Sequence, residues 1–139
     1  PISDKHEVSA IREALENKYQ PVREHIVKAN TLLADRENPD YENSIKESIS
    51  AVEAICEILT STGGKEATLE AVEKLEDKGI KIHPALKAAY SSLYGYTSDA
   101  SGIRHAKNVG GKNSTFEEAK YMLVVCSAFV NYLIALEAK

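Results

Sequence analysis

Apolar residues recur three and four positions apart along most of the 139-residue chain, which is the spacing of amphipathic helices. The spacing predicts a first helix from about Asp4 to Tyr19 and a second that begins near Pro21 and ends in a polar run. A third helix is predicted over about Asp40 to Thr60. The first half of the chain is therefore expected to be helical throughout.

The second half continues the helical pattern. The stretch ATLEAVEKLEDKG predicts a short helix closed by Gly79, and another helix starts at Pro84. The last helix follows a capping box made by Thr115 with Glu118, or by the pair one residue earlier. These elements predict an all-α bundle of about six helices, four of them long, in a single domain that covers residues 1–139.

The third predicted helix carries an apolar arc wider than half its circumference, so we expect it to be central in the bundle. Its main stripe consists of Ile45, Ile49, Val52, Cys56 and Leu59. Ser44, Glu47 and Ser48 project within or beside this arc. Because buried polar groups need hydrogen bonds, these three side chains are expected to find polar partners.

The last predicted helix contains the longest apolar run, residues 121–136, which is shorter than the roughly 20 residues that a membrane span needs. We expect a core helix, central in the bundle or shared with a partner chain, and no membrane association. The first ten residues lack the pattern of a signal peptide, so the cytoplasm is the expected location. The chain is either a complete processed protein or the C-terminal module of a longer one.

Composition argues against a metal or a cofactor. The four histidines and two cysteines form no closely spaced ligand pairs, so no structural metal is expected. Cys56 and Cys126 each lie in an apolar run, which is typical of reduced, packed cysteines. The sequence GGKNS lacks the spacing of a phosphate-binding P-loop, and no strand precedes it.

Charge is unevenly distributed. The net charge is −4, yet residues 79–115 hold five Lys or Arg against one Asp, a local charge of +4. A mostly acidic protein is not expected to bind DNA or other nucleic acid indiscriminately, but a local basic segment can attract a phosphate. A solvated loop with lysines explains the same charges.

Within the basic segment, TSDASGIRHAKNVGGKNS at residues 97–114 interrupts the helical pattern and carries Arg104 and His105. Arg offers a planar charged fork for phosphate, and His exchanges protons near neutral pH. Together they could cleave a phosphodiester without a metal, with His105 moving a proton and Arg104 stabilising charge on the phosphate. An Arg-His pair in a loop is also common as a surface or structural feature.

Other polar and aromatic residues are candidates with equally ordinary structural explanations. Glu47 could orient His105 or Arg104 across the bundle, or be a partly exposed structural acid. Asp99 could cap a turn through its side chain. Tyr94 and Tyr96 could stack a base, or be core residues with a hydrated hydroxyl.

Three blocks resemble a known family: RENPDYENSIKESISAVEAIC, IHPALKAAYSSLYGYTSDASGIRHA and AKYMLVVCSAFVNYLI. Together they are similar to the HEPN (higher eukaryotes and prokaryotes nucleotide-binding) domain of bacterial abortive-infection proteins of the AbiJ type. The resemblance covers most of residues 35–135. It implies a helical bundle, frequently a homodimer with its polar site near the dimer interface, and often metal-independent ribonuclease activity.

The resemblance also implies roles for individual residues. In active members an Arg and a His activate a ribose 2′-hydroxyl against the adjacent phosphate, which makes Arg104 and His105 the catalytic candidates together with Glu47. The family's polar positions on the central helix correspond to Ser44, Glu47 and Ser48. The candidate ligand-binding residues for RNA or a nucleotide are Ser44, Ser48, Tyr96, Asp99 and Lys107.

The sequence departs from the family motif at one point. The usual motif places four to six residues between Arg and His, whereas Arg104 is followed at once by His105 and no later histidine exists. Two functions therefore stay open. The first is a metal-independent endoribonuclease acting in phage defence or as a toxin. The second is a non-catalytic HEPN module that binds a nucleotide or RNA, or serves in dimerisation.

Overall fold

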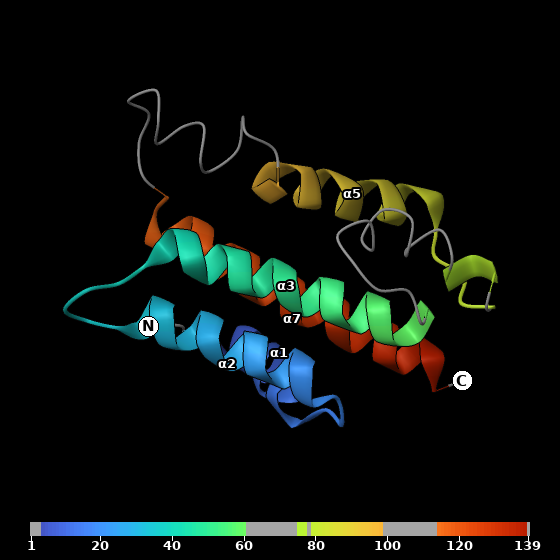
Figure 1. The fold of residues 1–139 in the computed structure, drawn as a ribbon, viewed down its shortest axis with the longest axis horizontal. Helices are drawn as coiled ribbons and strands as arrows, with labels where there is room; N and C mark the ends of the chain where they lie inside the picture. The colour runs from blue at the N-terminus through green and yellow to red at the C-terminus, as the bar shows by residue number, and fades with distance from the viewer. Residues whose placement is uncertain (1–3, 61–74, 78, 99–113, 139) are drawn as a thin grey trace.

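The computed structural model describes residues 4–60, 75–77, 79–98 and 114–138, and for 93–98 it describes the backbone alone. All regular structure in these ranges is helical, so the predicted all-α bundle is confirmed. Five helices have defined bounds: α1 (Lys5–Glu16), α2 (Gln20–Ala34), α3 (Tyr41–Thr60), α5 (Pro84–Ser98) and α7 (Phe116–Glu137). Figure 1 shows them arranged in layers, with α3 and α7 between the α1–α2 pair and α5.

The helix starts follow the capping signals in the sequence. The Asp4 carboxylate accepts hydrogen bonds from the backbone N–H of His6 and Glu7 at the start of α1. Thr115 caps α7 by accepting from the backbone N–H of Glu118 at 3.2 Å, as the capping box predicts. These bonds satisfy N–H groups that have no partner inside the helix.

The first helix is shorter than predicted. It ends at Glu16, whereas the apolar spacing extends it to Tyr19. The reason is Asn17, whose side-chain nitrogen donates to the Ala14 carbonyl and whose side-chain oxygen accepts from the backbone N–H of Tyr19. An Asn side chain that bonds nearby backbone groups in this way replaces the helical hydrogen bonds and turns the chain.

The short helix predicted before Gly79 falls mostly outside the described residues, and only its last turn at 75–77 is seen. Gly79 adopts a φ of 86°, a left-handed conformation that glycine tolerates best. Its N–H donates to the Glu76 carbonyl, and the N–H of Ile80 donates to the Leu75 carbonyl. This is a Schellman termination, so the predicted glycine stop is confirmed.

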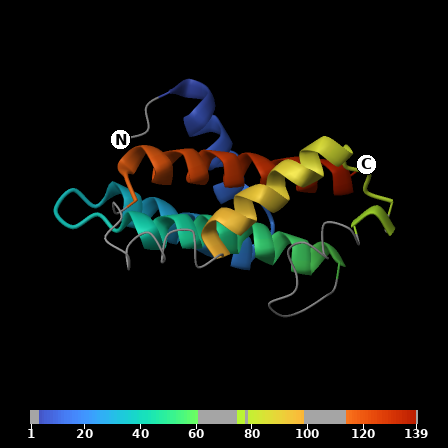
Figure 2. The same ribbon diagram turned by 90° about the horizontal axis from the view of Figure 1, so that it is seen from above.

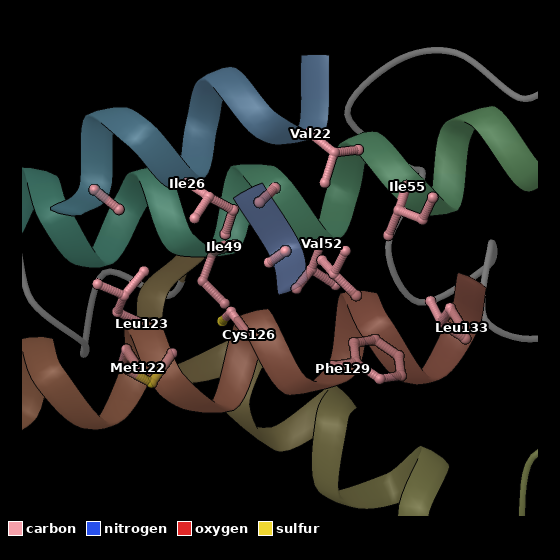
Figure 3. Packing of buried hydrophobic residues seen from close by; sticks show 14 of the residues in the cluster. Val22, Ile26, Ile49, Val52, Ile55, Met122, Leu123, Cys126, Phe129 and Leu133 are labelled. Carbon is pink, nitrogen blue, oxygen red and sulfur yellow. The ribbon is translucent and has the colours of Figure 1, made fainter. Parts of the chain in front are cut away.

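The two central helices, α3 and α7, form the largest part of the core. They lie side by side and run in the same direction, while α2 and α5 run in the opposite direction (Figures 1 and 2). Ile55, Leu123, Phe129 and Leu133 lie in this region of the core and are almost completely buried (Figure 3). Ile45 of α3 is also completely buried. The prediction that the third helix is central is confirmed, since ten of its residues are buried.

Side-chain contacts attach the outer helices α5 and α1 to α7. Tyr90 of α5 stacks on Phe129, with ring centroids 3.4 Å apart and an interplanar angle of 24°. On the side of α1, the Asn131 side chain donates to the Ala10 carbonyl at 2.9 Å.

Within the described residues α7 is also the one helix whose length and apolar composition would allow a membrane span. Its buried face here packs against the rest of the bundle.

The two cysteines are buried and unpaired, as the sequence predicts. Burial raises the pKa of both Cys56 and Cys126 from 9.0 to about 12, and Glu53 and Glu57 add to the effect at Cys56. We therefore expect the folded protein to resist a thiol reagent such as Ellman's reagent at pH 8, because the reactive thiolate is disfavoured and enclosed. Both thiols should react once the chain is unfolded in urea. Rapid labelling of either thiol in the folded protein would contradict the packing of α3 against α7.

The same shifts predict how stability depends on pH. A thiol whose pKa is higher in the folded state than in the unfolded state, where it is about 8.5, favours folding as long as it is protonated. Its contribution is complete below about pH 8.5 and is lost as the pH rises toward 12.

Candidate functional site

Some of the residues predicted to carry the chemistry are among the described residues and others are not. Arg104, His105, Asp99 and Lys107 lie outside the described residues. Tyr96 lies in the last turns of α5, where the backbone alone is described. The catalytic and ligand-binding roles of these residues stay predictions. Ser44, Glu47 and Ser48 lie on α3 and can be placed in full.

The described residues on either side of residues 99–113 show where this stretch joins the bundle. Upstream it follows Ser98, the last residue of α5, and downstream it meets Ser114 and the start of α7. There Phe116 packs edge-to-face on Tyr41, the first residue of α3, with ring centroids 6.2 Å apart. Glu47 is six residues along α3 from Tyr41, about 9 Å at 1.5 Å per residue. The basic segment thus returns to the bundle at the end of α3 that carries Glu47.

Ser44 and Ser48 are completely buried and find the polar partners that the sequence demands. The Ser44 hydroxyl donates to the Ala29 carbonyl of α2 at 2.7 Å, and the Ser48 hydroxyl donates to the Ser44 carbonyl at 3.1 Å. The small side chains let α2 approach α3 closely enough for the first of these bonds. The Ser44 hydroxyl thus joins α3 to α2, the Ser48 hydroxyl bonds within α3, and both are completely buried, so neither is accessible to a ligand.

Glu47 pairs with a residue that the sequence analysis did not select. Its Oε2 lies 2.6 Å from Nδ1 of His25 on α2. The side chain of Glu47 is 26% exposed and that of His25 is 32% exposed. When Glu47 is ionised, the imidazole donates a hydrogen bond to it from Nδ1. In the neutral ring this tautomer makes Nε2 the acceptor nitrogen. The pair joins the edges of α2 and α3 and remains partly open to water.

The position of this pair could have been derived from the sequence. A short turn at residues 35–40 makes α2 and α3 antiparallel, so residues at equal distances from the turn face each other. The bond between Ser44 and Ala29 fixes that register, and His25 and Glu47 are opposite each other in the same register. The sequence signal for the pair is the register of the α2–α3 hairpin, which the apolar spacing within a single helix does not reveal.

Further acidic groups lie along α3 beyond the pair. Burial raises the pKa of Glu53, and the nearby Glu57 raises it further, whereas His25 acts in the opposite direction. His25 is therefore in the electrostatic field of more than one carboxylate. An imidazole that a carboxylate orients can accept or donate a proton through its other nitrogen, which is the arrangement that general acid–base catalysis uses.

The strength of the pair can be measured by a double-mutant cycle with His25→Ala, Glu47→Ala and the double variant. We expect a coupling of about 0.5–1 kcal/mol, because both side chains are partly exposed and water screens their interaction. Urea unfolding of the wild type and the three variants at pH 7 gives the four free energies of unfolding that the cycle needs. A coupling near zero would show that the two side chains do not interact in solution.

No group of three or more His, Cys, Asp or Glu side chains within the described residues is arranged to hold a metal ion. Comparison of the chain with protein-family models, with curated proteins and with solved structures yields no match.

Proposed function

We propose that this protein is a metal-independent, HEPN-type endoribonuclease that acts in phage defence or as a toxin. The observation that carries the proposal is the block YGYTSDASGIRHA at residues 94–106, which lies in the basic part of an otherwise acidic chain. The all-α architecture is compatible with that function, as is the position of Glu47 in the half of α3 whose first residue, Tyr41, contacts the start of α7.

The proposed reaction uses the RNA's own 2′-hydroxyl. His105 takes the proton from O2′, the O2′–P bond forms, and the P–O5′ bond breaks. The products are a 2′,3′-cyclic phosphate and a 5′-hydroxyl, whose oxygen takes its proton from water. Arg104 stabilises the negative charge that develops on the phosphate oxygens. Glu47 would contribute from α3 as a positioning residue, and His25 is the imidazole that it contacts in this structure.

The second candidate is a non-catalytic module that binds RNA or a nucleotide through the same basic segment. The adjacency of Arg104 and His105 favours it, because neighbouring side chains rarely face the same phosphate oxygen and ribose hydroxyl. Both candidates require the lysines and Arg104 of residues 79–115 for binding, so salt dependence is common to both. Cleavage is what separates them.

The test is incubation of a labelled single-stranded RNA with the protein in EDTA between about pH 6 and 8. The ribonuclease predicts cleavage of the RNA and none of a 2′-deoxy substrate of the same sequence. If the protein shifts RNA in a gel but leaves it intact at high concentration, the binding module replaces the enzyme. If it does not cut RNA and binds neither RNA nor a nucleotide, both proposals fail.

We also propose that two copies associate through the outer surface of α7. Tyr121 is 58% exposed there, and Ala128 and Ala135 are exposed on the same side. With Val125 and Tyr132 these residues follow the 4-3-4-3 spacing of a coiled-coil seam. In an antiparallel pair centred on Ala128, each Tyr121 would face the small Ala135 of the other copy.

Ala128→Glu places a charge at the centre of this seam and is expected to weaken dimerisation at least tenfold, since the carboxylate would be buried without a partner. Sedimentation equilibrium measures the dissociation constant. Val27→Glu is the control, because Val27 is an exposed apolar residue on α2, away from the seam. A wild-type protein that remains monomeric at high concentration would rule out the dimer.

A further inference from the structure

An open groove lies between α1 and the segment that connects α2 to α3. Its volume is about 620 Å³, which is within the roughly 300–1,000 Å³ of small-molecule sites in proteins. None of the residues that line the groove has a role in the proposed ribonuclease, so the function of the groove is separate from that proposal. Its walls combine an apolar surface with two positive charges.

The apolar part of the groove is mainly aliphatic. Ile11 of α1 and Leu33 of α2 form buried surface on its two sides, and Leu15 adds to the α1 side. At the far end Phe116 and Tyr41 pack edge-to-face on each other, with an interplanar angle of 73°. Such a surface favours an alkyl chain over a heterocyclic base, which needs donors and acceptors along its edge.

Two guanidinium groups line the same groove. Arg12 of α1 and Arg36 of the connecting segment are exposed, and neither has a hydrogen bond or ion pair with any other residue in the described ranges. The carboxylate of Asp35 also lines the groove, but its Oδ1 accepts the backbone N–H of Glu37 and Asn38. The groove therefore offers two cations against one carboxylate that is already engaged.

We propose that this groove binds an amphipathic organic anion whose alkyl chain lies against Ile11 and Leu33 and whose head group is held by Arg12 and Arg36. The guanidinium fork suits carboxylate and phosphate heads equally well, because both accept two parallel hydrogen bonds. A groove of this size removes a medium-length chain from water, and burial of each CH₂ group strengthens binding. The ligand class is thus an alkyl carboxylate or alkyl phosphate.

The test is calorimetric titration of the full chain with decanoate and with decyl phosphate, each below its micelle concentration. We expect saturable binding of one equivalent, and the tighter of the two identifies the head group. Decanol, which has the same chain without the charge, should bind at least tenfold more weakly. Decanol binding as tight as both anions would overturn the role of the guanidinium groups.

Variants distinguish the groove from nonspecific adsorption. The double variant Arg12→Ala/Arg36→Ala should bind the anion at least tenfold more weakly, whereas Lys28→Ala, which removes a cation from the exposed side of α2, should bind as the wild type does. Ala34→Trp fills the groove from its rim without deleting core atoms and should abolish binding. Circular dichroism confirms that each variant is folded. No binding by the folded wild type, or equal binding by the double variant, would overturn the proposal.

Discussion

Phe129→Ala is expected to lower the free energy of unfolding by about 3–5 kcal/mol, the usual cost of truncating a buried phenylalanine. Phe129 is 1% exposed and lies in the contact between α7 and its neighbours (Figure 3). The substitution also removes the ring on which Tyr90 stacks. Because domains are typically stable by about 5–15 kcal/mol, this loss is a large fraction of the total.

Urea unfolding followed by circular dichroism measures the effect, with Val27→Ala as the control. Val27 is 51% exposed on α2, so its truncation should change stability by less than about 0.5 kcal/mol. A loss below about 1 kcal/mol for Phe129→Ala would mean that the core between α3, α5 and α7 is not packed as described.

Arg104→Ala is expected to lower the rate of RNA cleavage about 10²–10³-fold, which is the usual effect of removing a group that stabilises developing charge. The guanidinium is the residue of the basic segment best suited to the oxygens of the scissile phosphate. His105→Ala should lower the rate about 10²–10⁴-fold, because it removes the proposed proton acceptor. Rates are measured in EDTA under single-turnover conditions.

Lys112→Ala is the matched control, since Lys112 is another cation of the same segment with no proposed catalytic role. It should weaken RNA binding modestly and leave the rate at saturating protein unchanged. If Lys112→Ala and Arg104→Ala reduce cleavage equally, Arg104 acts through general electrostatic attraction and is not catalytic.

The helices could be predicted from the sequence because their signals are local. Apolar spacing located α3, the capping box located the start of α7, and Gly79 located the end of the short helical turn at 75–77. The end of α1 was misplaced, and it depends on hydrogen bonds between Asn17 and its neighbours. An Asn at that position also fits an exposed helical residue, so spacing alone did not reveal the stop. In addition, α5 runs to Ser98, one residue past the start of the predicted interruption at residue 97.

The contacts between helices were harder to predict, because they depend on how distant segments pack. The need of Ser44 and Ser48 for polar partners followed from periodicity, but the partners themselves are backbone carbonyls. The pair of His25 with Glu47 follows from the α2–α3 register once the hairpin is recognised. The groove lined by Arg12 and Arg36 has no local signal, since α1 and the connecting segment meet only in the folded bundle.

The measurement that tests the ribonuclease proposal most directly is mass spectrometry of the RNA ends produced in EDTA by wild-type protein and by Arg104→Ala, prepared in parallel. The account predicts fragments ending in a 2′,3′-cyclic phosphate with the wild type and intact RNA with the variant. Parallel preparation matters because a contaminating nuclease would produce the same ends in both samples. Identical fragments from wild type and Arg104→Ala, or intact RNA in both, would contradict the proposal.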